Sequence, residues 1–141
     1  MRRSKAEIYL HFVWTTYQRL PFILEEIERD LFRCIQEEVQ HLGCDVLALN
    51  GMPDHLHLLV KMPTRLAPAQ LMQQVKGVSS RFATEQLKQG GFCWQEGYGV
   101  FSIGRNQRKG VIAYIANQKQ HHTDNTIHSD WEETDEEYIP A

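Results

Sequence analysis

The chain is predicted to be an α+β domain in which four strands form one antiparallel sheet. A strand–helix–strand pattern of apolar residues occurs twice in succession, a short turn joins the two units, and one more helical segment follows. The order β-α-β-β-α-β is that of the split βαβ, ferredoxin-like (RRM-like) arrangement. A chain of 141 residues is long enough for one such domain with a buried core.

The first strand and the first helix have clear hydrophobic periods. Residues 7–16 alternate between two faces, which is typical of a half-buried strand. Over residues 24–42 the apolar positions recur three and four apart, which predicts an amphipathic helix. Gly43 directly after this segment is a natural helix end, because glycine adopts the left-handed conformation without strain.

The second and third strands are predicted to form a hairpin. Residues 44–50 are short and apolar, and strict alternation would place Val46 and Ala48 on the same face. The turn-forming residues 51–54 then lead directly into the apolar run 55–62.

The second half of the chain contains the remaining strand and two helices. Pro68 is predicted to begin a helix, and Gly77 within that helix suggests close approach by another group. Residues 92–99 form an irregular aromatic segment, residues 100–103 a fourth strand, and residues 107–122 a last helix.

In this topology the first and third strands lie at the centre of the sheet. His55 and His57 begin the third strand and share one face, whereas Leu56 and Leu58 face the core. We expect two helices on the core face and an open histidine face, to which His11 of the first strand also belongs. Side chains about 6.6–7 Å apart along a strand can converge on one metal ion. A hydrogen-bonded, half-buried histidine pair is the alternative.

The composition places limits on the class of protein. Three cysteines without a Cys-x-x-Cys spacing argue against a disulfide framework and for a reducing, cytoplasmic compartment. No apolar run approaches the length of a membrane span, and no secretion signal follows the basic N-terminus. Residues 1–119 carry fifteen basic and eleven acidic side chains, whereas residues 124–141 carry seven acidic and no basic ones. We therefore divide the chain into a mildly basic domain, residues 1–123, and an acidic tail.

A second motif lies in the last predicted helix. Tyr114 and Gln118 are one helical turn apart and would share a face. Together with His55-Leu56-His57, the segment Tyr114-Ile115-Ala116-Asn117-Gln118 resembles the signature of HUH nucleases with a single tyrosine. Further blocks, in the same order, resemble the IS200/IS605 transposases: residues 11–16, 76–81 and 94–102. The resemblance covers about residues 6–123.

The resemblance implies a transposase that cleaves and rejoins single-stranded DNA through a 5′-phosphotyrosine and recognises DNA hairpins at element ends. It implies Tyr114 as the nucleophile, with His55, His57 and Gln118 as ligands of Mg²⁺ or Mn²⁺. It also implies a homodimer in which the tyrosine of one protomer can serve the histidines of the other. Such chemistry needs a cation that relieves charge on the phosphate and a tyrosine hydroxyl that can lose its proton.

Several other residues are candidates for a role. His11, His121 and His122 could assist the site as a hydrogen-bond partner, a ligand or a proton carrier. Three aromatic residues could stack on unpaired bases or belong to the core: Phe92, Trp94 and Tyr98. The basic residues expected to contact DNA phosphates are Arg2, Arg3, Lys5, Arg19, Lys76, Arg81, Arg105, Arg108 and Lys109.

Two alternatives to an active transposase stay open. One is a non-catalytic or domesticated DNA-binding protein that keeps the fold, and the other is a metal-dependent nuclease that uses water, with Tyr114 merely packed. Neither alternative needs all four of the motif residues together.

Overall fold

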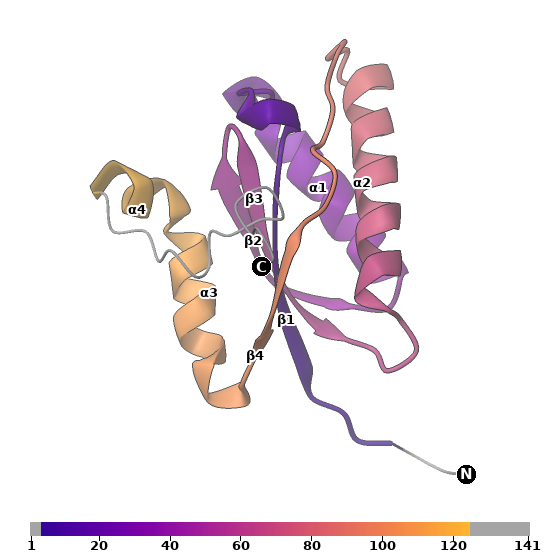
Figure 1. Ribbon diagram of the computed structural model, residues 1–141, viewed down its shortest axis with the longest axis vertical. Coiled ribbons are helices and arrows are strands. Elements are labelled where there is room, and N and C mark those ends of the chain that lie inside the picture. The colour runs from indigo at the N-terminus through magenta and orange to yellow at the C-terminus, as the bar shows by residue number, and fades with distance from the viewer. Residues whose placement is uncertain (1–3, 125–141) are drawn as a thin grey trace, which may run out of the picture.

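A computed structural model describes residues 4–124 and contains one four-stranded antiparallel sheet (Figure 1). The strand order is β2-β3-β1-β4, which confirms the ferredoxin-like fold and the central position of the histidine strand β3. The strands are β1 (Ile8–Thr15), β2 (Asp45–Met52), β3 (His55–Met62) and β4 (Gly99–Ile103). The helices are α1 (Glu25–His41), α2 (Pro68–Glu85), α3 (Arg108–Ala116) and α4 (Gln118–Asp124), with short 3-10 turns η1 (Tyr17–Arg19) and η2 (Arg105–Gln107).

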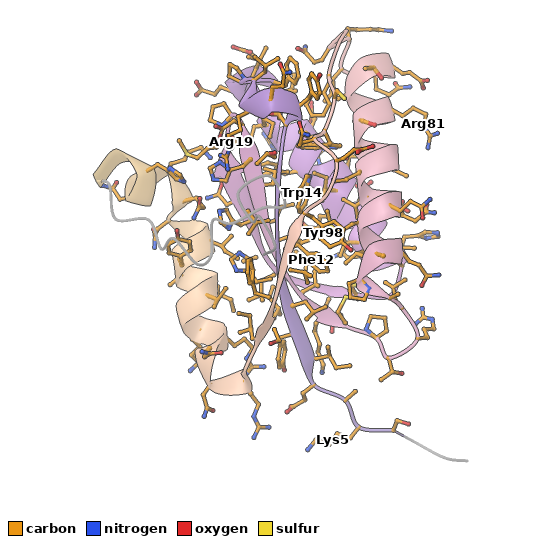
Figure 2. All side chains as sticks on the ribbon, viewed as in Figure 1. Lys5, Phe12, Trp14, Arg19, Arg81 and Tyr98 are labelled. Atoms are coloured by element: carbon orange, nitrogen blue, oxygen red, sulfur yellow. The ribbon has the colours of Figure 1, made fainter. Side chains whose placement is uncertain are left out.

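The main core lies between the sheet and the helices α1 and α2. Phe12 and Trp14 of β1 point into it, as do Leu56 and Leu58 of β3, and all four are fully buried. Figure 2 shows the two β1 side chains between the sheet and these helices. The alternation predicted for β1 and β3 is therefore confirmed.

The expectation of an open histidine face is wrong. Helices α3 and α4 lie on that side of the sheet, opposite α1 and α2 (Figure 1). Val111 and Ile115 of α3 pack there against Tyr9, Leu59 and Ile103. Packing on the sheet removes these apolar side chains of α3 from water. The helix therefore covers the histidines.

Strict alternation in β2 fails at a β-bulge. Val46 pairs with Val60, and Ala48 pairs with the next residue of β3 to be paired, Leu59. Leu47 is therefore the extra, bulged residue of β2. As a result Val46 packs into the main core, while Leu47 and Ala48 both lie on the α3 side. The bulge thus supplies two successive apolar residues to the surface on which α3 packs.

The predicted last helix is divided into two. Asn117 leaves the helical region with φ −103° and ψ 25°, and the Asn50 side chain of β2 donates from Nδ2 to the Ala116 carbonyl oxygen at 3.1 Å. That carbonyl would otherwise accept a bond within a continuous helix. Tyr114 therefore lies in the last turn of α3, which ends at Ala116, whereas Gln118 begins α4.

Two glycines differ in what they permit. A Cβ on Gly51 would lie 2.2 Å from the His55 carbonyl oxygen, so the hairpin that begins β3 requires glycine there. The close approach expected at Gly77 is not made by any of residues 4–124, since a Cβ there would meet none of their atoms within 4 Å.

Other expectations concern the helix end, the cysteines and membranes. Gly43 follows α1 with φ +95°, as predicted for a helix end, and the three cysteines are free thiols. Between residues 4 and 124, none of the helices combines the length and the apolar character needed to cross a membrane. Arg2, Arg3 and the acidic tail from residue 125 lie outside the described residues.

Candidate functional site

The candidate site is centred on His55 and His57 of β3. In the β1–β3 register Thr15 lies opposite His55 and Val13 opposite His57, which places both imidazoles on a central strand, near one end of the sheet. Their rings are 5.2 Å apart between centroids, and both residues are buried. Buried polar rings need hydrogen-bond partners or ligands, so the contacts of each nitrogen are informative.

The Nδ1 atoms of the two histidines have different partners. His55 Nδ1 lies 2.7 Å from Asp54 Oδ1, and His57 Nδ1 lies 2.9 Å from His11 Nε2. These contacts orient both rings so that Nε2 is the remaining donor atom of each. His11 therefore lies where the sequence suggested, as a hydrogen-bond partner on the adjacent strand.

Gln118 joins this group from the start of α4. Its Oε1 atom lies 3.3 Å from His55 Nε2 and 3.2 Å from His122 Nε2, and the residue is fully buried. Its Nε2 atom is buried without a hydrogen-bond partner among the described residues. A buried amide in this state indicates a position adapted to a further ligand or to water.

Tyr114 approaches the other histidine. Its ring packs edge-on against His57 with centroids 6.0 Å apart and an interplanar angle of 80°. The contact is made within one chain. The group formed by His55, His57, Gln118 and Tyr114 is called the four-residue site below.

A carboxylate lies directly beside His55 and carries the charge of the site. The hydrogen bond from His55 lowers the pKa of the Asp54 carboxyl, which the charges of His55 and Arg19 lower further and burial partly opposes. A neutral imidazole has one N–H, yet both ring nitrogens of His55 face oxygen acceptors, Asp54 Oδ1 and Gln118 Oε1. A proton or a metal ion at Nε2 would satisfy this arrangement, and so would the other amide orientation, in which Gln118 Nε2 donates to His55.

The donor set itself restricts which metal could bind. Among residues 4–124 no group of three or more His, Cys, Asp or Glu side chains is arranged to hold a metal ion. Two imidazoles and one amide oxygen remain, which fit an open site for a divalent ion. They do not fit the closed cysteine- and histidine-rich site of structural zinc.

The basic residues predicted to contact DNA do not form one surface. Arg19 lies beside Asp54, whereas Arg81 lies on α2, across the sheet (Figure 2). Arg105 forms an ion pair with Glu7 at 2.9 Å, and Arg108 donates to the Tyr9 hydroxyl at 2.8 Å. Lys109 is exposed nearby, at the start of α3.

Lys76 and two of the aromatic candidates have structural contacts. Lys76 Nζ donates to the carbonyl oxygens of Gln95 and Gly97, which holds the segment after α2 against that helix. Phe92 and Trp94 are buried in the main core, where Trp94 packs edge-on against Trp14 at 5.8 Å. Their burial agrees with the core role that the sequence offered as the alternative to stacking on bases.

Three further residues of the site region did not emerge from the sequence. Asp54 directly precedes His55, and its position beside a predicted ligand histidine could have identified it from the sequence. Asn50 lies opposite His57 in the β2–β3 register. Lys119 Nζ contacts Glu28 Oε1 at 2.9 Å and Asn50 Oδ1 at 3.1 Å, a cluster that no local pattern reveals. The side chain of His121 is outside the described part of the structure.

Comparison with known proteins gives consistent matches. The family model described as "Transposase IS200 like" matches residues 4–118. The ISDra2 transposase TnpA of Deinococcus radiodurans is 27% identical over 127 residues, covering 84% of this chain and 91% of that protein. The transposase for insertion sequence element IS200 of Salmonella typhimurium is 25% identical over 114 residues, covering 77% and 74%.

A solved structure shares the fold. It is a tyrosine transposase bound to a REP hairpin, with a TM-score of 0.64 and 16% identity, covering 95% of this chain and 80% of that one.

Proposed function

The chain belongs to the IS200-like transposase family, and from this premise we propose that it cleaves and rejoins single-stranded DNA through Tyr114. The observation that carries the proposal is the four-residue site. Its members come from β3, α3 and α4, and they meet within one chain: His57 contacts Tyr114, and His55 contacts Gln118. Neither a packing role nor simple DNA binding requires these four side chains to converge.

The proposed cofactor is Mg²⁺ or Mn²⁺, held by His55, His57 and Gln118. The two Nε2 atoms and the amide oxygen are the donors that the contacts of Asp54 and His11 leave in position. When bound, such an ion would withdraw charge from the phosphate oxygens as a Lewis acid. The preference for these hard ions over softer ones rests on the family, because imidazole alone also suits several other metals.

The proposed nucleophile is the Tyr114 hydroxyl. A phenol has a reference pKa of about 10, so it must lose its proton to a nearby base or beside a cation before it attacks. The phenolate oxygen then forms a bond to phosphorus while the bond from phosphorus to the 3′-oxygen breaks, and the leaving oxygen gains a proton. The products are a 5′-phosphotyrosine and a free 3′-hydroxyl. The reverse attack by a 3′-hydroxyl rejoins the strand without an external energy source.

Two further residues would position the histidines. The carboxylate of Asp54 holds His55 through Nδ1, and His11 holds His57 in the same way. Contacts of this kind fix the tautomer and orientation of ligand histidines. We propose that Asp54 and His11 are positioning residues that do not touch the DNA.

The proposed substrate is a single strand with a hairpin near the cleavage position. The structural relative described as bound to a REP hairpin supports a hairpin substrate for this fold. A homodimer, which the family resemblance implies, is part of the proposal. Because Tyr114 contacts His57 of its own chain, we propose that a protomer can cleave with its own tyrosine.

The test is capture of a covalent protein–DNA adduct. The protein is incubated with Mn²⁺ and a labelled single strand taken from the DNA adjoining its gene, then denatured and separated by electrophoresis. We expect an adduct that is absent from Tyr114→Phe and present in Tyr98→Phe, a matched variant of a tyrosine packed against the main core. Cleavage without an adduct would indicate a nuclease that uses water, and binding without cleavage would indicate a non-catalytic DNA-binding protein.

A further inference from the structure

The loop between β1 and α1 combines exposed apolar side chains with backbone strain. Five large hydrophobic side chains are exposed between residues 4 and 124, and three of them lie in this loop: Tyr17, Leu20 and Leu24. Between them, Gln18 and Arg19 have φ values of 52° and 54°. Non-glycine residues adopt this left-handed conformation rarely, and they keep it where the surroundings impose it.

The surroundings hold the loop from two sides. The Thr16 N–H donates to the Asp54 carbonyl oxygen at 2.9 Å, which ties the loop to the β2–β3 hairpin. The Tyr17 N–H donates to the Cys93 carbonyl oxygen at 2.9 Å, and the Gln18 N–H donates to Gln95 Oε1 at 3.1 Å. The Tyr17 ring is therefore presented to solvent, 45% exposed, on a turn that is held against two neighbouring segments.

The loop is connected to the four-residue site through one carboxylate. Arg19 Nη1 lies 3.9 Å from Asp54 Oδ2, and Asp54 Oδ1 lies 2.7 Å from His55 Nδ1. An exposed aromatic ring and a guanidinium thus stand at the same end of the sheet as His55, as the position of Arg19 in Figure 2 shows. A ligand bound to Arg19 would be separated from His55 by a single side chain.

The chemistry of the loop favours a nucleotide. Aromatic faces beside basic side chains are what proteins use to hold unpaired bases and the adjoining phosphates. The guanidinium has five N–H donors, so one Arg can contact a carboxylate and a phosphate together. Acidic Glu25 and Glu26 follow Leu24 in the first turn of α1 and would repel phosphate. The suitable surface therefore extends from Tyr17 away from α1, and Arg19 offsets the charge of the Asp54 carboxylate that lies between it and His55.

We propose that Tyr17 and Arg19 form a subsite for the nucleotide next to the cleaved phosphate. The base stacks on the Tyr17 ring, and Arg19 contacts the phosphate that follows it. This inference rests on the proposed function, because the subsite would bind the nucleotide beside the phosphate that Tyr114 would attack. It concerns binding of the strand and does not involve the bond-breaking step.

The experiment measures strand binding without cleavage. In a Tyr114→Phe background, fluorescence anisotropy is used to determine the Kd for a labelled single strand of mixed sequence that carries 5-iodouracil, over a range of salt concentrations. Tyr17→Ala should raise Kd about 10-fold, whereas Tyr17→Phe, which keeps the ring, should leave it unchanged. Arg19→Gln should reduce the slope of log K against log salt by about 0.7, the value for one phosphate contact on a single strand. Arg33→Gln, on the exposed face of α1, is the matched control and should not change the slope.

Photocrosslinking gives an independent readout. The iodouracil should crosslink to Tyr17, which is mapped by mass spectrometry. If the parent protein binds the strand but Tyr17→Ala leaves Kd unchanged and crosslinks fall elsewhere, the subsite is wrong while the proposed function stands. If Tyr17→Ala changes the sedimentation of the protein without affecting DNA binding, the loop is a protein contact and the assignment also fails. If the parent protein does not bind single strands at all, both the subsite and the proposed function are wrong.

Discussion

The two faces of the sheet are covered by helices in different ways. On the α1/α2 face, eighteen buried residues within 4–124 form one apolar cluster. On the α3/α4 face the corresponding cluster has five, and the rest of that face holds the buried polar groups of the four-residue site and its partners. Burial of apolar surface is the main source of folding free energy. The α1/α2 face therefore supplies most of the stability, and the α3/α4 face holds the candidate chemistry.

This difference explains how α3 and α4 are attached. Apart from the small cluster, their junction is held by polar contacts from β2 and α1: Asn50 binds the Ala116 carbonyl, and Lys119 binds both Asn50 and Glu28. Polar contacts at the surface contribute little to stability, but they select one geometry. The position of Tyr114 over His57 thus depends on a few directional contacts and not on a large buried area.

The largest expected effect is on activity and comes from the α3/α4 face. His57→Ala should lower the rate of adduct formation by about 1,000-fold or more, which corresponds to about 4 kcal/mol of barrier. Hairpin binding, measured by anisotropy with an adjoining hairpin strand, should stay nearly intact because the histidine is buried under α3. Loss of hairpin binding in a variant with an unchanged circular dichroism spectrum would contradict this division of roles.

Neighbouring leucines on β3 provide a direct comparison of stability. Leu58 faces the large cluster and Leu59 the small one, and both are fully buried. Leu58→Ala should lower the free energy of unfolding by about 4 kcal/mol and Leu59→Ala by about 2–3 kcal/mol, within the range for such truncations. Urea denaturation measures both values, and an equal or larger loss for Leu59→Ala would show that the two faces are equally important for folding.

An intermediate effect is expected for Asp54→Asn. Loss of the carboxylate that orients His55 should reduce metal-dependent cleavage by about 10- to 100-fold, which is measured by titrating Mn²⁺ in the adduct assay. If activity is lost to the same extent at saturating and at low Mn²⁺, Asp54 does not act through metal binding.

The same substitution has a consequence for stability at acid pH. The pKa of Asp54 is lowered in the folded protein, so its contribution is complete above the unfolded pKa and is lost as pH falls through the folded value. Asp54→Asn should therefore weaken the dependence of the unfolding free energy on pH below about 4, the reference value for aspartate. Parallel curves for the two proteins in this range would contradict the assigned cause.

The smallest effect on stability is expected for Lys119→Ala. Its ion pair with Glu28 is partly exposed, so the loss should be about 0–1 kcal/mol. The rate of adduct formation should nevertheless fall by more than the small loss in unfolding free energy accounts for. Lys119 helps to fix the start of α4 and hence the position of Gln118. Arg33→Ala on α1 is the control, and equal adduct yields for the two variants would show that these contacts do not position the site.

Periodicity and motif spacing in the sequence determined the strand order, the central position of β3 and the faces of its side chains. Alternation along a strand assigns His55 and His57 to one side and Leu56 and Leu58 to the other without reference to the rest of the chain. The resemblance of the motifs also selected Tyr114 and Gln118, which the structure brings to the histidines from two separate helices.

The tertiary structure alone decided how the histidine face is covered. The bulge at Leu47, the break at Asn117 and the contacts of Asn50 and Lys119 join residues that are far apart in the chain. Such features depend on packing and on hydrogen bonds between elements, and these leave no period in the sequence. For the same reason the loop with Tyr17 and Arg19 could be recognised as a neighbour of His55 only after the hairpin had folded against it.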